Sequence, residues 1–343
     1  INPNVIQNSS LYYIIYAIKS TILNISLNDD LNVGDVSNEL FKINFKEITF
    51  DIDFNSQIHP DAMPKVKKIV FYENSLFNQP IKERSFPELE EIKFGFNFNS
   101  QIQPGAMPKV TEIDFSRAYM FNQPILEGTF KELEEIIFGS NFNSQIVPGA
   151  MPNVTKIKFG HFFNKPIIED IFPNLKEITF GGSFNSQIVP GAIPNVTKIV
   201  FVMDSHFNQP IEKGIFPALE EIVFPPGFNS QINPGDMPNV KKITFSDYSQ
   251  FDKEIIAETF PELTEITFGK DFNSQIHPGA MPNVKEIEFG FEFNQPILEG
   301  TFPKLKKITF GDQFNQPINP GAMPKVKTIS FGEKFNQKIE TLD

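Results

Sequence analysis

The amino-acid sequence predicts a β-rich array of short repeats that stack side by side in a single domain. Two observations support this fold class. A Phe–Asn pair, with Asp252 replacing one Asn, returns at steps of 21 residues nine times and 23 residues four times. A short stretch of alternating hydrophobic residues precedes each pair, as expected for a strand with one buried face. The Phe residues of the fourteen pairs are Phe54, Phe77, Phe98, Phe121, Phe142, Phe163, Phe184, Phe207, Phe228, Phe251, Phe272, Phe293, Phe314 and Phe335.

Each repeat is expected to contain one strand, a loop that carries the Phe–Asn pair, and an irregular return. The strand has the pattern V/L-x-x-I-x-F, as in residues 154–159. The return starts at an Ile three positions after the Asn and contains Pro and Gly, as in residues 147–152, so a helix of useful length cannot form there. Repeats of the type FNSQI-x-PGAMP alternate with repeats of the type FNQPI-x-x-G-x-FP, which gives a 42-residue period until repeat 13.

A single repeat cannot fold alone. Burying its five or six apolar side chains offers roughly 10–18 kcal/mol, whereas ordering 21 residues costs roughly 1–2 kcal/mol each. Stacking closes this gap because each repeat also covers the hydrophobic faces of its neighbours. The two Phe columns account for 28 of the 39 Phe residues, so they are expected to form a spine in the core. The Asn column is expected to be buried and to bind loop backbone groups of adjacent coils.

The repeats resemble leucine-rich repeats, and specifically the FNIP or FGxxFN class found in slime moulds and giant DNA viruses. The stretch FNQPI carries this resemblance at residues 77–81, 121–125, 207–211, 293–297 and 314–318, and the resemblance covers about residues 45–343. It implies a leucine-rich-repeat solenoid with a curved parallel β-sheet on the concave face and an irregular convex side. It also implies a role in interactions.

The two ends of the chain differ from the repeats. Residues 22–32 copy the repeat spacing with Leu in place of Phe, and hydrophobic residues between 11 and 22 line one side of a helix that Ser9 or Ser10 is placed to cap. We therefore expect an N-terminal cap over residues 1–44, followed by fourteen repeats over residues 45–343. The C-terminal stretch FNQKIETLD contains no cap, and an uncovered last coil favours pairing with another chain.

The composition argues against catalysis and against several classes of partner. The chain has no Cys, which fits a reducing compartment, and His161 and His206 lie in loops without a paired nucleophile. We therefore expect a non-enzymatic protein with no catalytic residue, cofactor or metal. The net charge of −12 disfavours nucleic acid and anionic membranes as partners, and residues 11–27 are too polar to span a membrane. The expected location is the cytoplasm, or the host-cell cytoplasm if the protein is viral.

Strand residues on either side of the Ile are expected to face solvent. The column before the Ile alternates between Glu and Lys along much of the chain, which predicts a cross-strand ladder worth roughly 0.2–1 kcal/mol per pair. The alternative is a solvated face arranged to avoid like-charge contacts. Three consecutive Glu residues and a nearby Asp interrupt the ladder and predict an acidic bay that could receive a basic segment, while two Val residues on adjacent strands predict an apolar stripe. These residues are Glu91, Glu112, Asp114 and Glu135 for the bay, and Val200 and Val223 for the stripe.

Two-residue insertions lengthen the loop between the two Phe residues in repeats 2, 4, 8 and 10. These loops read FYENSLF, FSRAYMF, FVMDSHF and FSDYSQF, and all four are expected on one rim. They contain Met203 and every Tyr outside the expected cap, namely Tyr72, Tyr119 and Tyr248. Tyr suits exposed contact sites, and loops on a rigid scaffold often carry recognition. The alternative is neutral variation in a tolerant loop.

Together these features predict a scaffold that binds another protein through its concave face and rim loops. The apolar contacts would come from the three rim Tyr residues, Met203, Val200 and Val223, with the acidic bay steering the partner. Two other functions stay open. The chain could self-associate as a structural homo-oligomer through its last coil, which light scattering would detect as a concentration-dependent mass. The rim Tyr residues could bind glycans, which would quench Tyr fluorescence.

Overall fold

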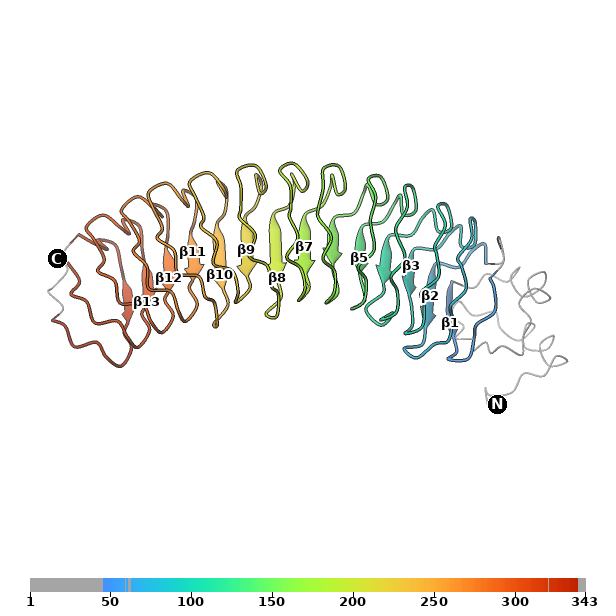
Figure 1. Cartoon of the computed structure of the whole chain (residues 1–343), viewed down its shortest axis with the longest axis horizontal. Coiled ribbons are helices and arrows are strands. Elements are labelled where there is room, and N and C mark those ends of the chain that lie inside the picture. Colours follow the sequence, from blue (N-terminus) through green and yellow to red (C-terminus); the bar gives the residue numbers. More distant parts are fainter. Residues whose placement is uncertain (1–45, 59, 61–62, 320, 339–343) are drawn as a thin grey trace.

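The computed structural model of the chain describes residues 46–58, 60, 63–319 and 321–338. In this part of the chain, fourteen strands form one sheet in chain order (Figure 1). Every neighbouring pair is parallel. The strands are β1 (Glu47–Phe50), β2 (Lys68–Phe71), β3 (Glu91–Lys93), β4 (Glu112–Asp114), β5 (Glu135–Ile137), β6 (Lys156–Lys158), β7 (Glu177–Phe180), β8 (Lys198–Phe201), β9 (Glu221–Phe224), β10 (Lys242–Phe245), β11 (Glu265–Thr267), β12 (Glu286–Glu288), β13 (Lys307–Thr309) and β14 (Thr328–Ser330).

The strands alternate as the sequence predicts. In β6, Ile157 is buried between two exposed Lys residues, and it pairs in register with Ile136 on one side and Ile178 on the other. The same register repeats along the whole sheet, because each strand contributes one central Ile to a continuous row. The predicted parallel solenoid of one-strand repeats is therefore confirmed.

The two Phe columns form the predicted spine of the core. Within each coil the two rings stack with centroids 3.7–4.4 Å apart. Between coils, the rings of the second column stack at 5.7–6.1 Å. Aromatic pairs in such geometry contribute about 0.5–1.5 kcal/mol beyond the area that they bury. Each coil is thus held to its neighbour by the same pair of ring contacts.

The Asn column forms a continuous hydrogen-bond ladder. In all thirteen steps, the backbone N–H of one Asn, or of Asp252, donates to the Oδ1 atom of the residue one repeat earlier, at 2.8–3.1 Å. The predicted bond between side chain and neighbouring loop backbone is confirmed. The predicted burial is not, because these residues are half-buried or exposed. An amide can make this bond at the surface because its acceptor points along the array toward the next coil.

The loops that follow the strands approach one another very closely. A Cβ atom added at Gly160 would lie 2.0 Å from the carbonyl oxygen of Gly139, and one added at Gly181 would lie 2.0 Å from that of Gly160. Only glycine fits such a contact with backbone, because a real Cβ does not approach an oxygen so closely. The coils can therefore draw together along this edge of the array.

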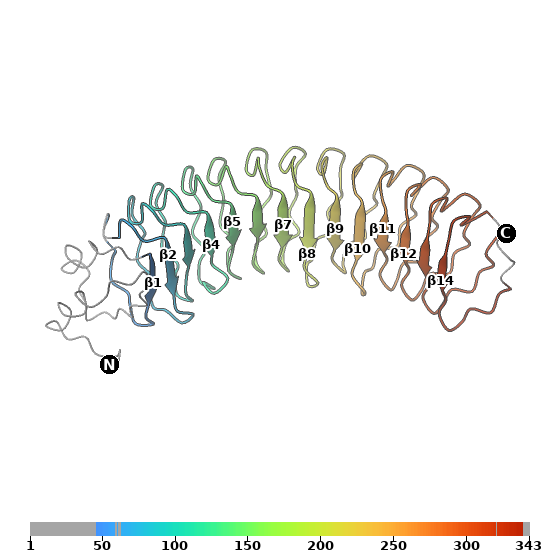
Figure 2. The same cartoon turned by 180° about the vertical axis from the view of Figure 1, so that it is seen from behind.

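The array is an arch, and its sheet forms one broad side of that arch. The strands run from the convex edge toward the concave edge, so the loops after the strands lie along the concave edge (Figures 1 and 2). The expectation that the sheet lines the concave side is therefore corrected. The closely approaching glycine loops, such as those at Gly139 and Gly160, lie along this concave edge (Figure 1).

The expected N-terminal cap, with its helix and degenerate repeat over residues 1–44, lies outside the described residues and stays a prediction. Between residues 46 and 338 the described part contains no helix. The first strand of the sheet is β1, which belongs to the first of the fourteen predicted repeats. The boundary at residue 45 therefore remains an expectation from the sequence.

Asp236 gives the fold an expected pH dependence. It is 5% exposed and stands where other FNSQI repeats carry a buried Ala such as Ala192 or Ala280. Burial raises the pKa of its carboxyl, although its Oδ2 accepts a 2.7 Å hydrogen bond from the N–H of Asn233. The folded state therefore holds the Asp236 proton more tightly than the unfolded chain does, so the stability that Asp236 contributes is lost as pH rises through this pKa.

We expect Asp236→Ala to raise the free energy of unfolding near pH 7 by about 1 kcal/mol, because it removes a buried charge. The difference between the two proteins should shrink on acidification and level off below an unfolded-state pKa of about 3.9. Urea denaturation at several pH values measures it, with the exposed Asp271→Ala as control. A difference that stays constant between pH 3 and pH 8 would contradict the assignment.

Candidate interaction site

Four lengthened loops lie where strands β2, β4, β8 and β10 end, on the concave edge of the arch (Figures 1 and 2). The residues predicted to be exposed there are exposed. The exposed fractions are 54% for Tyr72, 39% for Tyr119, 65% for Met203 and 69% for Tyr248. The structure thus places these four side chains on one edge, as expected.

Each lengthened loop is a defined turn anchored by a small buried residue. In the loop after β2, the N–H of Ser75 donates to the carbonyl of Tyr72 at 2.9 Å, and the Ser75 Oγ accepts the N–H of Phe77 at 3.2 Å. Ser205 and Ser249 do the same in the loops after β8 and β10. In the loop after β4, Ala118 takes this place one residue earlier, so two large side chains follow it. The insertions therefore present their side chains in fixed positions.

Exposed hydrophobic side chains are concentrated on the loops after the first four strands. We call this group the β1–β4 loop cluster. Backbone hydrogen bonds tie the loops together, from Leu76 N to Ile52 O at 2.8 Å and from Met120 N to Phe96 O at 3.3 Å. The rings of Phe96 and Tyr119 lie 5.5 Å apart. The members of the cluster are Ile52, Tyr72, Leu76, Phe96, Tyr119 and Met120, which are 39–54% exposed.

Two members of this cluster are predicted from the sequence, and four are not. Tyr72 and Tyr119 stood out as the rare Tyr residues of the array. Ile52, Leu76, Phe96 and Met120 lie in the same short loops, but hydrophobic residues are usually assigned to the core. A signal was present, because most other repeats carry polar or small residues between the two Phe positions.

The acidic bay is largely neutralised by neighbouring lysines. Glu91, Glu112 and Glu135 stand in register on adjacent strands, as predicted. Glu91 pairs with Lys68 at 2.7 Å and with Lys93 at 3.7 Å, and the Glu91 hydrogen bond raises the pKa of Lys68.

Of the three other acids in the bay, two have an ion pair with a lysine and one has none in the described part of the chain. Asp114 lies 3.8 Å from the Lys93 Nζ, and Glu135 lies 3.1 Å from the Lys156 Nζ. Glu112 alone of the four acids has no ion pair among the described residues. Besides Lys93, Lys68 and Lys156 reach the bay from neighbouring strands. Only Glu112 is left to attract a partner's positive charge.

The predicted apolar stripe exists but lies apart from the β1–β4 loop cluster. Val200 of β8 and Val223 of β9 pair in register, and both are half-buried. They lie on the strand side of the arch, nearer to Met203 and Tyr248 than to the first four loops in chain order. The ten predicted site residues therefore fall into two groups, one around β2–β5 and one around β8–β10.

The described residues offer no constellation for metal chemistry, since no group of three His, Cys, Asp or Glu side chains could hold an ion. Two imidazoles have single carboxylate neighbours, with His161 Nδ1 3.1 Å from an Asp204 oxygen and His277 Nε2 3.4 Å from a Glu254 oxygen. Neither pair has a nucleophile beside it. In the same part of the chain, no helix is long and apolar enough to cross a membrane.

Two solved structures share this architecture. The giant-virus protein CroV588, described as a novel circular leucine-rich-repeat structure, is 28% identical with a TM-score of 0.65, over 87% of this chain and 51% of that one. Toll of Drosophila, in its complex with Spatzle, is 12% identical with a TM-score of 0.51, over 90% of this chain and 47% of that one. The present chain thus spans about half the length of each. No curated protein matches it in sequence.

The fold is therefore a parallel β-solenoid of the leucine-rich-repeat class. The FNIP repeat profile matches residues 77–117, 121–162, 163–203, 251–292 and 293–334. These segments make up more than half of the sequence, and the chain belongs to the FNIP repeat family. The comparisons indicate no enzyme family.

Proposed function

We propose that this solenoid is a protein-interaction scaffold that binds its partner through the β1–β4 loop cluster. The carrying observation is the concentration of six large hydrophobic side chains on four adjacent loops of one edge, each 39–54% exposed. Contiguous exposed apolar surface rimmed by polar residues is typical of protein-binding sites. The hydrogen bonds between these loops support the proposal, because a partner would meet an ordered surface and little ordering entropy would be lost on binding.

The acidic residues beside the cluster fit a supporting role in this binding. Glu112 has no ion pair among the described residues, whereas Glu91 and Asp114 share Lys93 and Glu135 pairs with Lys156. Charges at the rim of an interface change the association rate more than the affinity. The second group, with Met203, Tyr248, Val200 and Val223, would extend the contact for a partner long enough to follow the concave edge.

The test is capture of partners from cell lysate by the full chain and by a variant with Tyr72, Leu76, Phe96 and Tyr119 all changed to Ser. Protein captured by the parent and lost with this variant is the expected result. The matched control changes Met203 and Tyr248 to Ser, which alters exposed apolar residues on the same edge outside the cluster. All six positions are exposed, so we expect both variants to keep the melting temperature of the parent within a few degrees.

Equal capture by the parent and by the cluster variant would contradict the proposed site. Capture lost only in the control would move the site to the loops after β8 and β10. Recovery of the chain itself, equally by all three proteins, would favour the second candidate function, which is self-association through the last described coil. That candidate rests on Ile329, Phe331 and Phe335, which are only partly buried there.

A further inference from the structure

The return segments of the coils alternate between two kinds of junction. At four of the five steps from an FNQPI-type repeat to the next FNSQI-type repeat, the Ile residues form parallel backbone bridges, for example Ile125 with Ile146 and Ile167 with Ile188. The step from repeat 8 to repeat 9 has no such bridge among the described residues. From an FNSQI-type repeat to the next FNQPI-type repeat, no such bridge is found among the described residues. Side-chain amides span this second junction instead.

Two kinds of amide bridge occur at the second junction, and both are present between repeats 1 and 2, 3 and 4, and 11 and 12. In the first, the Gln of the FNSQI repeat donates to a backbone carbonyl of the next repeat, as Gln101 Nε2 does to Pro124 O at 3.1 Å. In the second, the Gln of the FNQPI repeat reaches back to the preceding Asn, as Gln123 Nε2 does to Asn99 O at 2.9 Å. The first bridge also links Gln57 to Pro80, Gln231 to Glu254 and Gln275 to Pro296.

The junction between repeats 5 and 6 has neither bridge. Gln145 makes no side-chain hydrogen bond among the described residues, and Lys165 occupies the position of Gln123 in repeat 4 and Gln209 in repeat 8. A crevice of about 480 Å³ opens at this junction, which is within the size range of small-molecule sites. Its lining residues are Asn143, Ser144, Gln145, Ile146, Phe163, Lys165, Pro166, Ile168 and Ile171.

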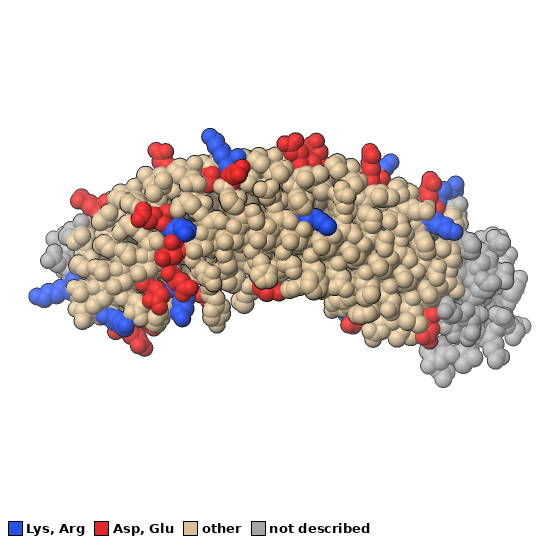
Figure 3. Space-filling view, in the orientation of Figure 1, with Lys and Arg blue, Asp and Glu red and all other residues tan. Residues whose placement is uncertain are grey.

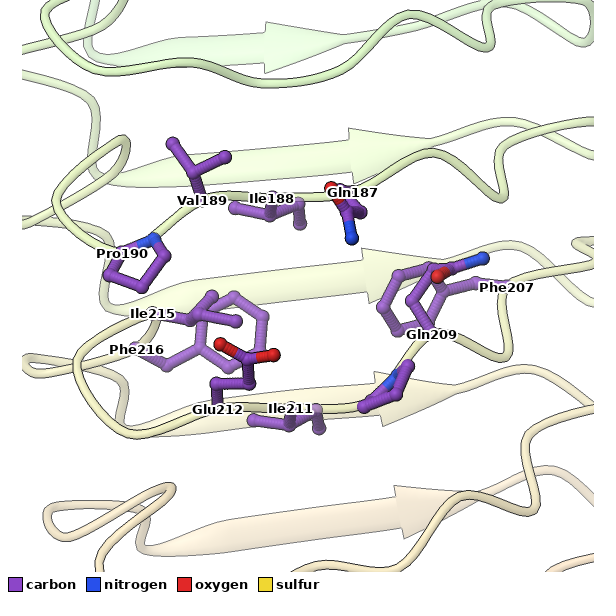
Figure 4. Close-up of a pocket in the computed structure, with 11 residues that line it drawn as sticks. Gln187, Ile188, Val189, Pro190, Phe207, Gln209, Ile211, Glu212, Ile215 and Phe216 are labelled. Atoms are coloured by element: carbon purple, nitrogen blue, oxygen red, sulfur yellow. The ribbon is translucent and has the colours of Figure 1, made fainter.

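The junction between repeats 7 and 8 lacks only one bridge and has a smaller crevice. The Gln187 side chain makes no hydrogen bond to the next repeat among the described residues, but Gln209 Nε2 still donates to Asn185 O at 2.9 Å. The crevice there is about 180 Å³. Figure 4 shows Ile188 and Val189 on one coil and Ile211 and Glu212 on the next, with the strands of the sheet behind them. The larger of the two crevices thus lies at the junction that lacks both amide bridges.

The walls of these two crevices have also become more apolar. In FNSQI repeats the residue after the Ile is His, Gln or Asn elsewhere. It is Val147 in repeat 5, next in sequence to the lining residue Ile146, and Val189, which lines the smaller crevice, in repeat 7. In FNQPI repeats the residue before the Phe of the return is Ser or Thr elsewhere, but it is Ile171 in repeat 6 and Ile215 in repeat 8. Both changes occur only in repeats 5–8.

The larger crevice carries one unpaired positive charge. Lys165 is exposed, and it has no ion pair or hydrogen bond among the described residues. The broad side of the arch in Figure 3 has few charged side chains in its middle and a column of them near its C-terminal end. No acidic side chain is among the residues that line the larger crevice. The smaller crevice is lined by Gln209 and Glu212 instead. Its charge is therefore negative, whereas that of the larger crevice is positive.

We propose that the crevice between repeats 5 and 6 binds an amphiphile with a hydrocarbon chain and a carboxylate head group. The carboxylate pairs with the Lys165 Nζ, and the free Gln145 amide donates to its second oxygen. The chain lies against Ile146, Ile168 and Ile171, where its burial provides the hydrophobic part of the affinity. The Gln145 side-chain amide and the Lys165 ammonium are exposed and bind no other side chain or backbone group among the described residues. They fix the orientation, as a few polar groups do in other mostly apolar sites.

The test uses the full chain and sodium decanoate in isothermal titration calorimetry, below the concentration at which decanoate forms micelles. Saturable binding of one decanoate per chain is expected. Lys165→Gln, which restores the residue of repeats 4 and 8, should weaken binding roughly tenfold or more, because it removes a charge-assisted hydrogen bond. Decanol should bind the two proteins equally. Ile171→Thr, which restores the residue of repeats 4, 10 and 12, should weaken decanoate and decanol alike.

Gln123→Lys is the matched control. It places the same charge at the equivalent position of repeat 4, where the Gln101 amide still spans the junction, so a decanoate affinity equal to that of the parent is expected. Absence of saturable decanoate binding, or equal affinity of the parent and Lys165→Gln, would overturn the proposal. A second decanoate gained by Gln123→Lys would also overturn it, because the charge alone would then create a site without the crevice.

Discussion

Replacing Gly160 with Ala is expected to lower the free energy of unfolding by about 3–5 kcal/mol. The new Cβ would lie 2.0 Å from the Gly139 carbonyl oxygen and 2.4 Å from its carbon. Both atoms belong to backbone that is held in a stacked loop, so the coils must move apart along the concave edge. The disturbance would reach both neighbours, because Gly181 packs against Gly160 in the same way.

Gly227→Ala is the control for this experiment, since no atom lies within 4 Å of the Cβ that it would add. We expect a change within about 0.5 kcal/mol there. Urea denaturation followed by circular dichroism measures both variants. A Gly160→Ala protein within 1 kcal/mol of the parent would show that the glycine contacts do not hold the coils together.

The second large effect is expected from Phe142→Ala. Phe142 is fully buried and stacks on Phe138 at 3.9 Å, on Phe121 at 5.9 Å and on Phe163 at 6.0 Å. Truncation would open a cavity in the middle of the spine and remove three ring contacts, at a cost of about 3–5 kcal/mol. Denaturant unfolding of the full chain measures this cost.

Two further substitutions test whether the stability lost in Phe142→Ala is due to the stacked Phe columns. Phe162→Ala removes a ring that is 50% exposed on the adjacent loop, and we expect a change within about 0.5 kcal/mol. Phe335→Ala removes the last ring of the spine, which is only partly buried, so it should cost clearly less than Phe142→Ala. Equal costs for Phe142 and Phe335 would contradict the view that each coil is stabilised by neighbours on both sides.

The sequence predicts the strands, the spine and the ladder because each depends on residue type at a fixed spacing. Ile157 lies in β6 and Phe159 directly follows that strand, with a Lys between them. The same I-x-F spacing returns at the thirteen other strands. The direction in which the arch bends could not be predicted in the same way. It depends on the spacing between coils along the two edges of the array, which is a distance between backbones and not a property of any side chain.

The candidate site could also be predicted only in part, because it depends on loop geometry and on where long side chains end. Tyr72 and Tyr119 were found because Tyr is rare in the array, whereas Phe96 and Leu76 resemble core residues until the loop geometry shows them facing solvent. The acidic bay was overestimated because neutralisation of Glu91 and Glu135 depends on where the Lys68 and Lys156 side chains end. The crevice at Lys165 was missed because it arises from two absent bridges.

The parallel stacking of single-strand coils also governs how the chain can fold. Partners in the sheet are always one repeat apart, as in Ile157 with Ile178, so no pairing in the described part has to close a long loop. The relative contact order therefore falls as coils are added, and a low contact order favours fast folding. A pair of coils formed anywhere in the array can act as the nucleus, and growth then proceeds outward in both directions.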